Sequence, residues 1–586
     1  MPFQISPGVN FSEIDLTTTV PAVATTEGAI AGVFRWGPED ERVLVSSEVE
    51  LVTRFGKPFA NTTWSNAETF FTAANFLGYS DALYVTRVTE SANTANGTVF
   101  DAKYAGALGN SLQIGYCDST SFAATSSTNT LTINASSVSG TINSSANTVD
   151  VEVGDTIVAD SQELSITALG STSGDANSGF TTAVTFDKKY VAASNLTTGA
   201  YSRQWGFASQ FDSAPDTGSV HMIVIDEDGE FSGVAGTVLE KFENVSLTAG
   251  AKTYDGSTNY IVDVLEQGSS FIAIDGNSVS GKGYDSMTGG TDGSSESAIS
   301  VGELATGYDL YRSPEDVDVS FILQGRPQTH VLANYIIDNI AEFRRDCVVF
   351  VSPESTDTTA QNIVDFAANV SSSSYAVLDS GYKYQYDKYS DVYRWVPLNG
   401  DIAGLCARTD DLRDPWFSPA GYARGSVKNV VKLRLNPNKV DRDLLYRNGI
   451  NPVITQPGQG TILYGDKTFL NQPSAFGHIN VRRLFIVLEK SISIAAKRSL
   501  FEFNDEFTRA QFRNLVEPYL RDVQGRRGIY DFRVVCDESN NTGDVIDRAE
   551  FVGDIYIKPA RSINYIQLNF VSVRSGVEFS EIVGQA

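Results

Sequence analysis

The sequence has few of the residue types on which enzymes and metal proteins depend. Its four cysteines are scattered and form no Cys-x-x-Cys pair, which argues against a disulfide scaffold and a cysteine zinc site. Only three histidines occur, and there is no His-Glu-x-x-His motif, no phosphate-binding loop and no Gly-x-Gly-x-x-Gly opening a helix. We therefore predict a protein that is not an enzyme and that uses no cofactor and no metal.

Long hydrophobic runs are missing as well. A membrane-spanning helix needs about 18 or more consecutive apolar residues, and no such stretch occurs. The first residues, MPFQISP, have neither the basic nor the apolar segment of a secretory signal. We expect no membrane insertion and no secretory leader.

Positive charge is scarce. The chain has 44 Lys and Arg against 71 Asp and Glu, a net charge of −27, so its field repels nucleic acid. Residues 91–300 hold seven basic and 24 acidic residues, a net of −17, whereas residues 481–530 hold ten and six, a net of +4. The basic segment is either a solvated helix face or a contact for an acidic neighbour.

What the sequence does have is enough apolar material for several cores. It is 586 residues long and 41% hydrophobic, and at about 150 residues per domain it predicts three to five domains. Strands at 221–226, 319–324 and 346–353 alternate with helix-like segments, which is typical of α/β folds. These helix-like segments are 233–245, 299–312, 329–344 and 358–370.

Residues 119–215 differ in composition from the rest. Ser, Thr, Asn and Gly dominate, with short alternating pieces such as 130–133 and 149–153. The segment is either a β-rich inserted domain with polar faces or a disordered low-complexity stretch, and the recurring Val, Ile and Leu favour folding.

The last 110 residues have the most regular pattern. Helical spacing predicts one helix over 481–503 and a second after Asn504-Asp505, with a kink at Pro518, followed by strands at 530–535, 551–557 and 564–573. Arg483, Lys490 and Lys497 recur every seven residues, so we expect them to form one outer stripe on the first helix.

Both ends of the chain look like extended arms. Each carries apolar residues on a segment too short and too rich in Gly, Pro and small polar residues to bury them in a domain of its own. We expect these residues to link neighbouring subunits by adding a strand to a sheet edge. They are Phe3, Ile5, Val9 and Phe11 at one end and Val577, Phe579, Ile582 and Val583 at the other.

Two further segments resemble binding motifs but have simpler structural explanations. Residues 382–397 interleave tyrosines with lysines, which suits stacking on bases or sugars, but a strand with half-buried tyrosines explains them better in so acidic a chain. Residues 226–229, DEDG, hint at a calcium loop, yet they fit a hairpin turn after strand 221–226 better.

A family resemblance rests on several long motifs in the same order. Residues 383–422, KYQYDKYSDVYRWVPLNGDIAGLCARTDDLRDPWFSPAGY, resemble the signature region of the tail sheath proteins of contractile-tailed, T4-like bacteriophages. Blocks before it (SPGV at 6–9, FRWGP at 34–38, NFLGY at 75–79) and after it (LYGDK at 463–467, INVRRLF at 479–485, PARSINY at 559–565) agree. The resemblance covers roughly 1–118 and 215–586 and fails across the segment between.

The resemblance implies a multidomain α/β and α+β fold: an α/β sheath core with a β-rich protruding insertion, a C-terminal α+β domain and an extended arm at each end. The expected divisions, in order along the chain, are an N-terminal arm at 1–20, a sheath core at 21–90 plus 354–478, a middle α/β domain at 91–118 plus 216–353, an outer insertion at 119–215, an inner domain facing the tube at 479–574 and a C-terminal arm at 575–586.

The resemblance also implies a function. Copies are expected to stack as hexameric rings in a helical sheath around the tail tube, to contract, and to drive the tube through the host envelope. The expected partners are the chain itself, the tube protein, and the baseplate and tail terminator proteins, with no direct nucleic-acid contact. Arg483, Lys490 and Lys497 would face the tube. Such a protein is assembled in the host cytoplasm and located in the virion.

Two other classes of function stay open. A pyocin-like or secretion-system sheath would share the mechanism but act elsewhere. A tail-associated glycan-binding protein or glycosidase would use residues 119–215 as a carbohydrate binder, and a pocket with apposed carboxylates would favour it.

Overall fold

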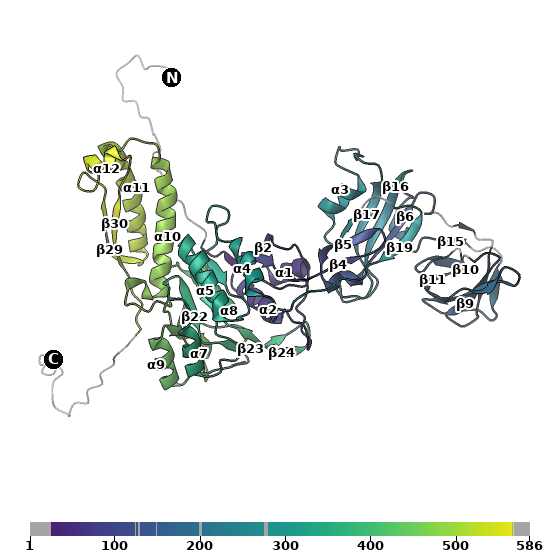
Figure 1. The fold of residues 1–586 in the computed structure, drawn as a ribbon, viewed down its shortest axis with the longest axis horizontal. Coiled ribbons are helices and arrows are strands. Elements are labelled where there is room, and N and C mark those ends of the chain that lie inside the picture. Colours follow the sequence, from purple (N-terminus) through teal and green to yellow (C-terminus); the bar gives the residue numbers. More distant parts are fainter. Residues whose placement is uncertain are drawn as a thin grey trace, which may run out of the picture.

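The computed structural model describes residues 25–564 and residue 567, apart from 123–124, 127–128, 148, 150, 199–201, 275–278 and 565–566. The described chain is elongated (Figure 1), with the C-terminal helices at one end, then a core sheet, a middle sheet, and the insertion strands at the other end. Buried apolar side chains gather in a separate cluster within each of these regions. The fold is mixed α/β, as predicted.

The core sheet has seven strands in the order β2-β3-β1-β20-β21-β22-β26, all parallel to their neighbours except β2. Strands β1, β20, β21 and β22 are buried along their length, as parallel strands covered by helices must be. The strands are β1 (Gly28–Gly32), β2 (Arg42–Val45), β3 (Leu83–Arg87), β20 (Phe321–Leu323), β21 (Val348–Val351), β22 (Ala376–Asp379) and β26 (Ile450–Asn451).

Helices cover this sheet, and the predicted α/β alternation is confirmed for the segments 299–312, 329–344 and 358–370. The core helices are α1 (Glu48–Phe55), α2 (Ala67–Leu77), α4 (Val301–Asp309), α5 (His330–Ile336), which continues through a π-helical turn into α6 (Glu342–Arg344), α7 (Ala360–Ala367), α8 (Asn399–Leu412) and α9 (Lys439–Arg447).

A three-stranded sheet, β24-β23-β25, packs beside α2. Its strands are β23 (Tyr382–Asp387), β24 (Val392–Pro397) and β25 (Lys432–Leu433). A hairpin of β27 (Val453–Gln456) and β28 (Gly460–Leu463) follows β26.

The middle region contains two antiparallel sheets. One has the order β17-β16-β6-β19 and the other β18-β5-β4, with α3 (Ile261–Gly268) beside them. The strands are β4 (Thr94–Asn96), β5 (Phe100–Ala105), β6 (Leu112–Asp118), β16 (Ser219–Asp226), β17 (Thr237–Ser246), β18 (Ile272–Ile274) and β19 (Lys282–Ser286).

One predicted helix is wrong in this region. Residues 233–245 were expected to be helix-like, but they hold strand β17, which pairs antiparallel with β16. The predicted hairpin after strand 221–226 is confirmed by the antiparallel pairing of β16 with β17, but its loop spans 227–236 and is longer than the predicted turn. The Asp226 carboxylate accepts hydrogen bonds from the backbone of Phe231 and Ser232 within this loop. The β-branched Thr237, Val238 and Val245 fit a half-buried strand better than a helix.

The insertion is β-rich, as its composition predicts. Its strands pair in the order β14-β8-β9-β13-β11-β10-β15-β7, with β12 beside β13, around buried residues such as Leu131, Ile142 and Leu164. The described residues of 149–153 form no strand and lead into β10. The strands are β7 (Thr125–Ser126), β8 (Thr130–Ile133), β9 (Ser139–Ser144), β10 (Thr156–Ala159), β11 (Gln162–Leu169), β12 (Ser173–Asp175), β13 (Gly179–Phe186), β14 (Leu196–Thr198) and β15 (Ser202–Gln204).

The C-terminal region is α+β. Helices α10 (Ile479–Ala496) and α11 (Glu506–Gly525) pack on a hairpin of β29 (Ile529–Val535) and β30 (Asp554–Pro559), with α12 (Gly543–Asp547) between the strands in sequence. The predicted first helix ends sooner than residue 503, because a 3₁₀ turn at Lys497–Ser499 and a left-handed Phe501, with φ of 70°, stop it. Pro518 lies inside α11 without ending it.

Candidate assembly surfaces

The β29–β30 hairpin is the one sheet of the C-terminal region among the described residues, and several of its side chains are exposed. The two strands pair from Ile529 with Pro559 to Val535 with Asp554, and one bulge interrupts the register. Among the described residues no third strand pairs with either outer edge. Unpaired N–H and C=O groups along such edges are a template for another strand.

The inner face of this hairpin is anchored and its outer face is open. Phe532, Val534, Ile555 and Ile557 pack against the cluster formed by α10 and α11. On the outer face the side chains of Tyr530 and Tyr556 are 67% and 61% exposed. A two-stranded sheet is only marginally stable alone, so added strands would stabilise it.

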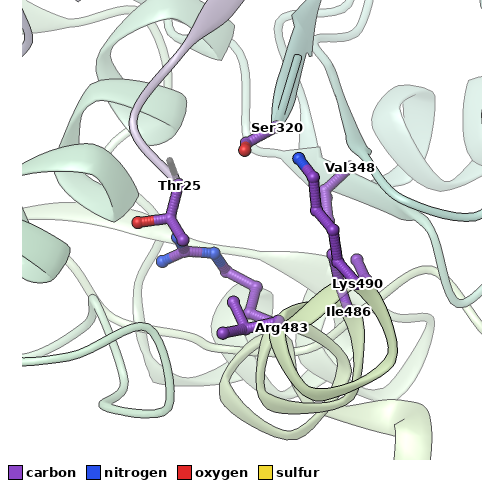
Figure 2. A pocket seen from close by; sticks show the side chains of 7 residues that line it. Thr25, Ser320, Val348, Arg483, Ile486 and Lys490 are labelled. Atoms are coloured by element: carbon purple, nitrogen blue, oxygen red, sulfur yellow. The ribbon is translucent and has the colours of Figure 1, made fainter. Parts of the chain in front are cut away.

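The arm residues themselves, Phe3, Ile5, Val9, Phe11, Val577, Phe579, Ile582 and Val583, lie outside the described part of the chain. The first described residue, Thr25, lines a small cavity of ≈ 10 Å³ between the core sheet and α10. Figure 2 shows Arg483 reaching from α10 toward Thr25, and Lys490 reaching toward Ser320 and Val348. The first described residue thus lies where the core meets the C-terminal region.

Arg483 is not part of an outer stripe, so that prediction is wrong for this residue. Its guanidinium is buried, forms an ion pair with Asp410 on α8, and donates to the Cys406 carbonyl at 3.3 Å. It also lies over the Phe321 ring, 4.8 Å from the centroid. Burial raises the pKa of the Asp410 carboxyl, and the adjacent Arg483 opposes that rise.

Lys490 also has an ionic partner within the chain. It forms an ion pair with Asp318, and only 14% of its side chain is exposed. Burial and the nearby Asp318 raise the pKa of Glu27 beside it, and Lys490 opposes the rise. Heptad spacing does place Arg483 and Lys490 on one face of α10, but that face packs on the core, where acidic residues compensate the charge.

Lys497 alone of the three is exposed, in the 3₁₀ turn after α10, next to the exposed Arg498. The residues that follow form a tip that the sequence did not single out. Its exposed apolar side chains are Leu500, Phe501, Phe503 and Phe507, with exposures from 61% to 106%. An exposed apolar cluster beside two cations is typical of an interaction surface.

A second junction joins the core to the middle region. Trp36, just after β1, is buried among middle-region rings, with centroids 5.4 Å from Tyr104 and 5.2 Å from Phe231. The buried Arg87 on β3 donates to the carbonyls of Phe34 and Gly37 at 3.0 and 2.8 Å. The ring contacts of Trp36 therefore join the core to the middle region.

The insertion is joined to the middle region by a similar contact. Trp205 and Phe211 stack 5.5 Å apart and pack on Ile223 and Ile225 of β16. Lys282 of β19 bonds Asp155 of the insertion at 2.6 Å, with both side chains almost fully buried. Residues 205–211 thus pack with the middle sheet, although the sequence placed them in the insertion.

The core holds buried polar groups in ion pairs and hydrogen bonds, although Asp401 Oδ2 and Gln324 Nε2 are buried without a hydrogen-bond partner. Lys383 bonds Asp401 at 2.9 Å with no exposure of either side chain, and burial raises the pKa of Asp379 to about 8. In the described part of the chain no group of three or more His, Cys, Asp or Glu is arranged to hold a metal. No helix there is long and apolar enough to cross a membrane.

Comparisons with known proteins show which family the chain is similar to. Residues 327–469 match the model of the phage tail sheath protein central domain, and residues 471–572 match that of the phage tail sheath C-terminal domain. The chain is 33% identical to the tail sheath protein of Vibrio phage KVP40, over 99% of this chain and 100% of that protein. It is 34% identical to the tail sheath protein of Enterobacteria phage T4, over 99% of both.

A solved structure extends the likeness to the fold. The crystal structure of the sheath tail protein from Listeria innocua superposes with a TM-score of 0.51 at 10% identity, over 92% of this chain and 96% of that one. The likeness at this identity concerns the fold alone.

Proposed function

Because this chain belongs to the tail sheath proteins of T4-like contractile phages, we propose that its copies stack as hexameric rings around a tail tube. Contraction of this helical sheath then drives the tube through the host envelope. The chain is a structural subunit of the virion, and its relatives are structural rather than enzymatic. Assembly in the host cytoplasm, on a baseplate and below a tail terminator, belongs to the same proposal.

The single observation that carries the assembly mechanism is the β29–β30 hairpin with both edges open among the described residues. An arm from a neighbouring subunit adds a strand to such an edge, and its backbone hydrogen bonds replace those with water. The added strand follows the hairpin when it moves, so rings stay linked while subunits change their angle. Such contacts do not close within a pair and therefore propagate into rings and helices.

The rest of the subunit is built to move as a rigid body. Trp36 joins the core to the middle region, and Trp205 joins the middle region to the insertion. The insertion, at the end opposite the C-terminal helices (Figure 1), then lies on the outside of the sheath. The C-terminal region, with its arms, lies next to the tube.

The tube contact is proposed for the tip after α10. Lys497 and Arg498 are exposed there beside Leu500 and Phe501. Exposed charges give a contact that salt screens and that breaks on contraction. We assign the tube contact to Lys497 and Arg498 instead of Arg483 and Lys490, because Arg483 and Lys490 form ion pairs with Asp410 and Asp318 of the core.

The function is tested by assembly of the purified chain with its tail tube protein. Negative-stain microscopy is expected to show striated tubules, in an extended form with the tube and a shorter, wider form after triggering. Monodisperse monomers under all conditions would contradict the proposal.

A further inference from the structure

The outer face of the β24-β23-β25 sheet is an aromatic platform. The strand register places Tyr384 opposite Trp395 and Tyr386 opposite Tyr393. The Tyr384 ring stacks on Tyr393 at 5.5 Å between centroids and lies 4.8 Å from Trp395. The four rings form a continuous surface along the hairpin, and Tyr386 and Tyr393 are 48% and 52% exposed.

Two cations lie on this platform. The Lys432 ammonium is 4.8 Å from the Tyr384 centroid and 5.5 Å from that of Trp395. The Arg434 guanidinium is 5.3 Å from the Trp395 centroid. Within the described residues neither cation forms an ion pair at 4.0 Å or less, and Arg434, also over the Tyr382 ring, lies near enough to Glu68 to oppose the rise of that carboxyl's pKa. Aromatic faces hold a cation in place while leaving its outer side free for an anion.

The other face of the sheet fixes the platform to the core. Gln385 accepts a hydrogen bond from Asn75 of α2 at 2.9 Å, and Lys383 pairs with the buried Asp401. The hairpin end is held by Lys388, which bonds Glu48 of α1 at 3.0 Å. The platform is therefore preformed, and a partner does not have to order it on binding.

We propose that this platform, the aromatic–cation face, binds the acidic segment 91–300 of a second copy of the chain. Residues 91–300 have a net charge of −17 and present exposed carboxylates, among them Asp212, Asp216, Asp255 and Glu266. The same chain thus carries both members of a complementary pair. The inference rests on the proposed sheath function, which brings many copies together.

Another occupant fits the charges less well. A neutral glycan would stack on the rings, yet it would leave Lys432 without an anion. A contact between two different surfaces of one chain is heterologous, which is the kind that extends a helical lattice.

The direct test is cross-linking in the assembled sheath. Full-length chains grown in ¹⁴N and ¹⁵N are mixed, assembled, and treated with a carbodiimide, which joins a lysine amine to a carboxylate with loss of water. We expect mixed-isotope peptides that join Lys432 to carboxylates within residues 91–300. Cross-links from Lys432 only to its own chain, only to the tube, or to none would overturn the inference. Absence of any polymer would instead contradict the proposed function.

A charge reversal gives an independent readout. Lys432→Glu is compared with Lys439→Glu, an equal charge change at an exposed position at the start of α9. Reversal on the platform is expected to weaken sheath association, measured by pelleting across salt concentrations, by about tenfold, because it places like charges opposite each other. Lys432→Arg is expected to behave like the original chain. Equal losses for Lys432→Glu and Lys439→Glu, with both variants folded by circular dichroism, would overturn the inference.

Discussion

Asp410, in the last turn of α8, and Arg483, in the second turn of α10, form an ion pair from which solvent is almost excluded, with 3% and 4% of their side chains exposed. A hydrogen bond from the Thr25 side chain also reaches Asp410. Thr25, helix α8 of the core and helix α10 of the C-terminal region therefore meet at one carboxylate. We expect a substitution in the Asp410–Arg483 pair to affect the N-terminal arm, which we propose links subunits.

The first prediction concerns this pair. Arg483→Glu would leave two buried carboxylates facing each other, so we expect the free energy of unfolding to fall by about 3–5 kcal/mol. Replacement of both partners by leucine is expected to cost far less, because no uncompensated charge remains. Urea denaturation of the monomer measures both. Equal stability of Arg483→Glu and the original chain would show that the pair does not join the two regions.

The second prediction concerns the tip after α10. Lys497→Glu with Arg498→Glu is expected to leave the monomer as stable as before, within about 0.5 kcal/mol, because both residues are exposed. It is expected to weaken co-sedimentation with the tube, and raised salt is expected to weaken the original contact in the same direction. Unchanged co-sedimentation of the double variant would remove these residues from the tube contact.

The third prediction concerns pH. Burial raises the pKa of Asp379 to about 8, whereas its ordinary value is 3.8. Between these values the unfolded chain loses the proton and the folded chain keeps it, so rising pH lowers the free energy of unfolding, by at most about 1.4 kcal/mol per pH unit. Asp379→Asn is expected to remove this part of the slope. The same slope in both proteins between pH 4 and 8 would contradict the buried, protonated state.

The fourth prediction concerns the insertion. Replacement of residues 125–204 by a short Gly/Ser linker is expected to leave a folded chain that still forms tubules, because the insertion has its own apolar cluster. Removal of 119–215 instead is expected to destabilise the middle region, since it deletes Trp205 and Phe211. Thermal unfolding and microscopy compare the two. A folded 125–204 replacement that forms no tubules would place the insertion in the lattice.

Much of the fold follows from local patterns in the sequence. Buried strands such as β21, bounded by turns and followed by amphipathic helices, are visible as apolar runs, and so are the two long C-terminal helices. Residues 233–245 show the limit: their spacing fits a helix, but pairing with β16, a long-range contact, decides the outcome.

The candidate surfaces were harder to predict. Seven-residue spacing correctly places Arg483 and Lys490 on one face of α10, yet only the position of Asp410 and Asp318 in space shows that this face is internal. Trp36 gives no local signal of its role, since its ring partners Tyr104, Phe231 and Phe271 lie 68 or more residues away. The acidic residues near position 410 were the one indication in the sequence that Arg483 has a partner within the chain.

The most direct test of the account is truncation of the arms. Removal of residues 1–16, or of everything after Ser575, deletes the apolar residues that we propose pair with the open edges of β29 and β30 on a neighbour. Burial of each such side chain contributes about 1.5–3 kcal/mol, so a full arm links subunits strongly. Sedimentation and electron microscopy of both truncated proteins, beside the full-length chain, are expected to show folded monomers that form no sheath. Normal sheaths from either truncated protein would show that its missing arm is not a connecting strand.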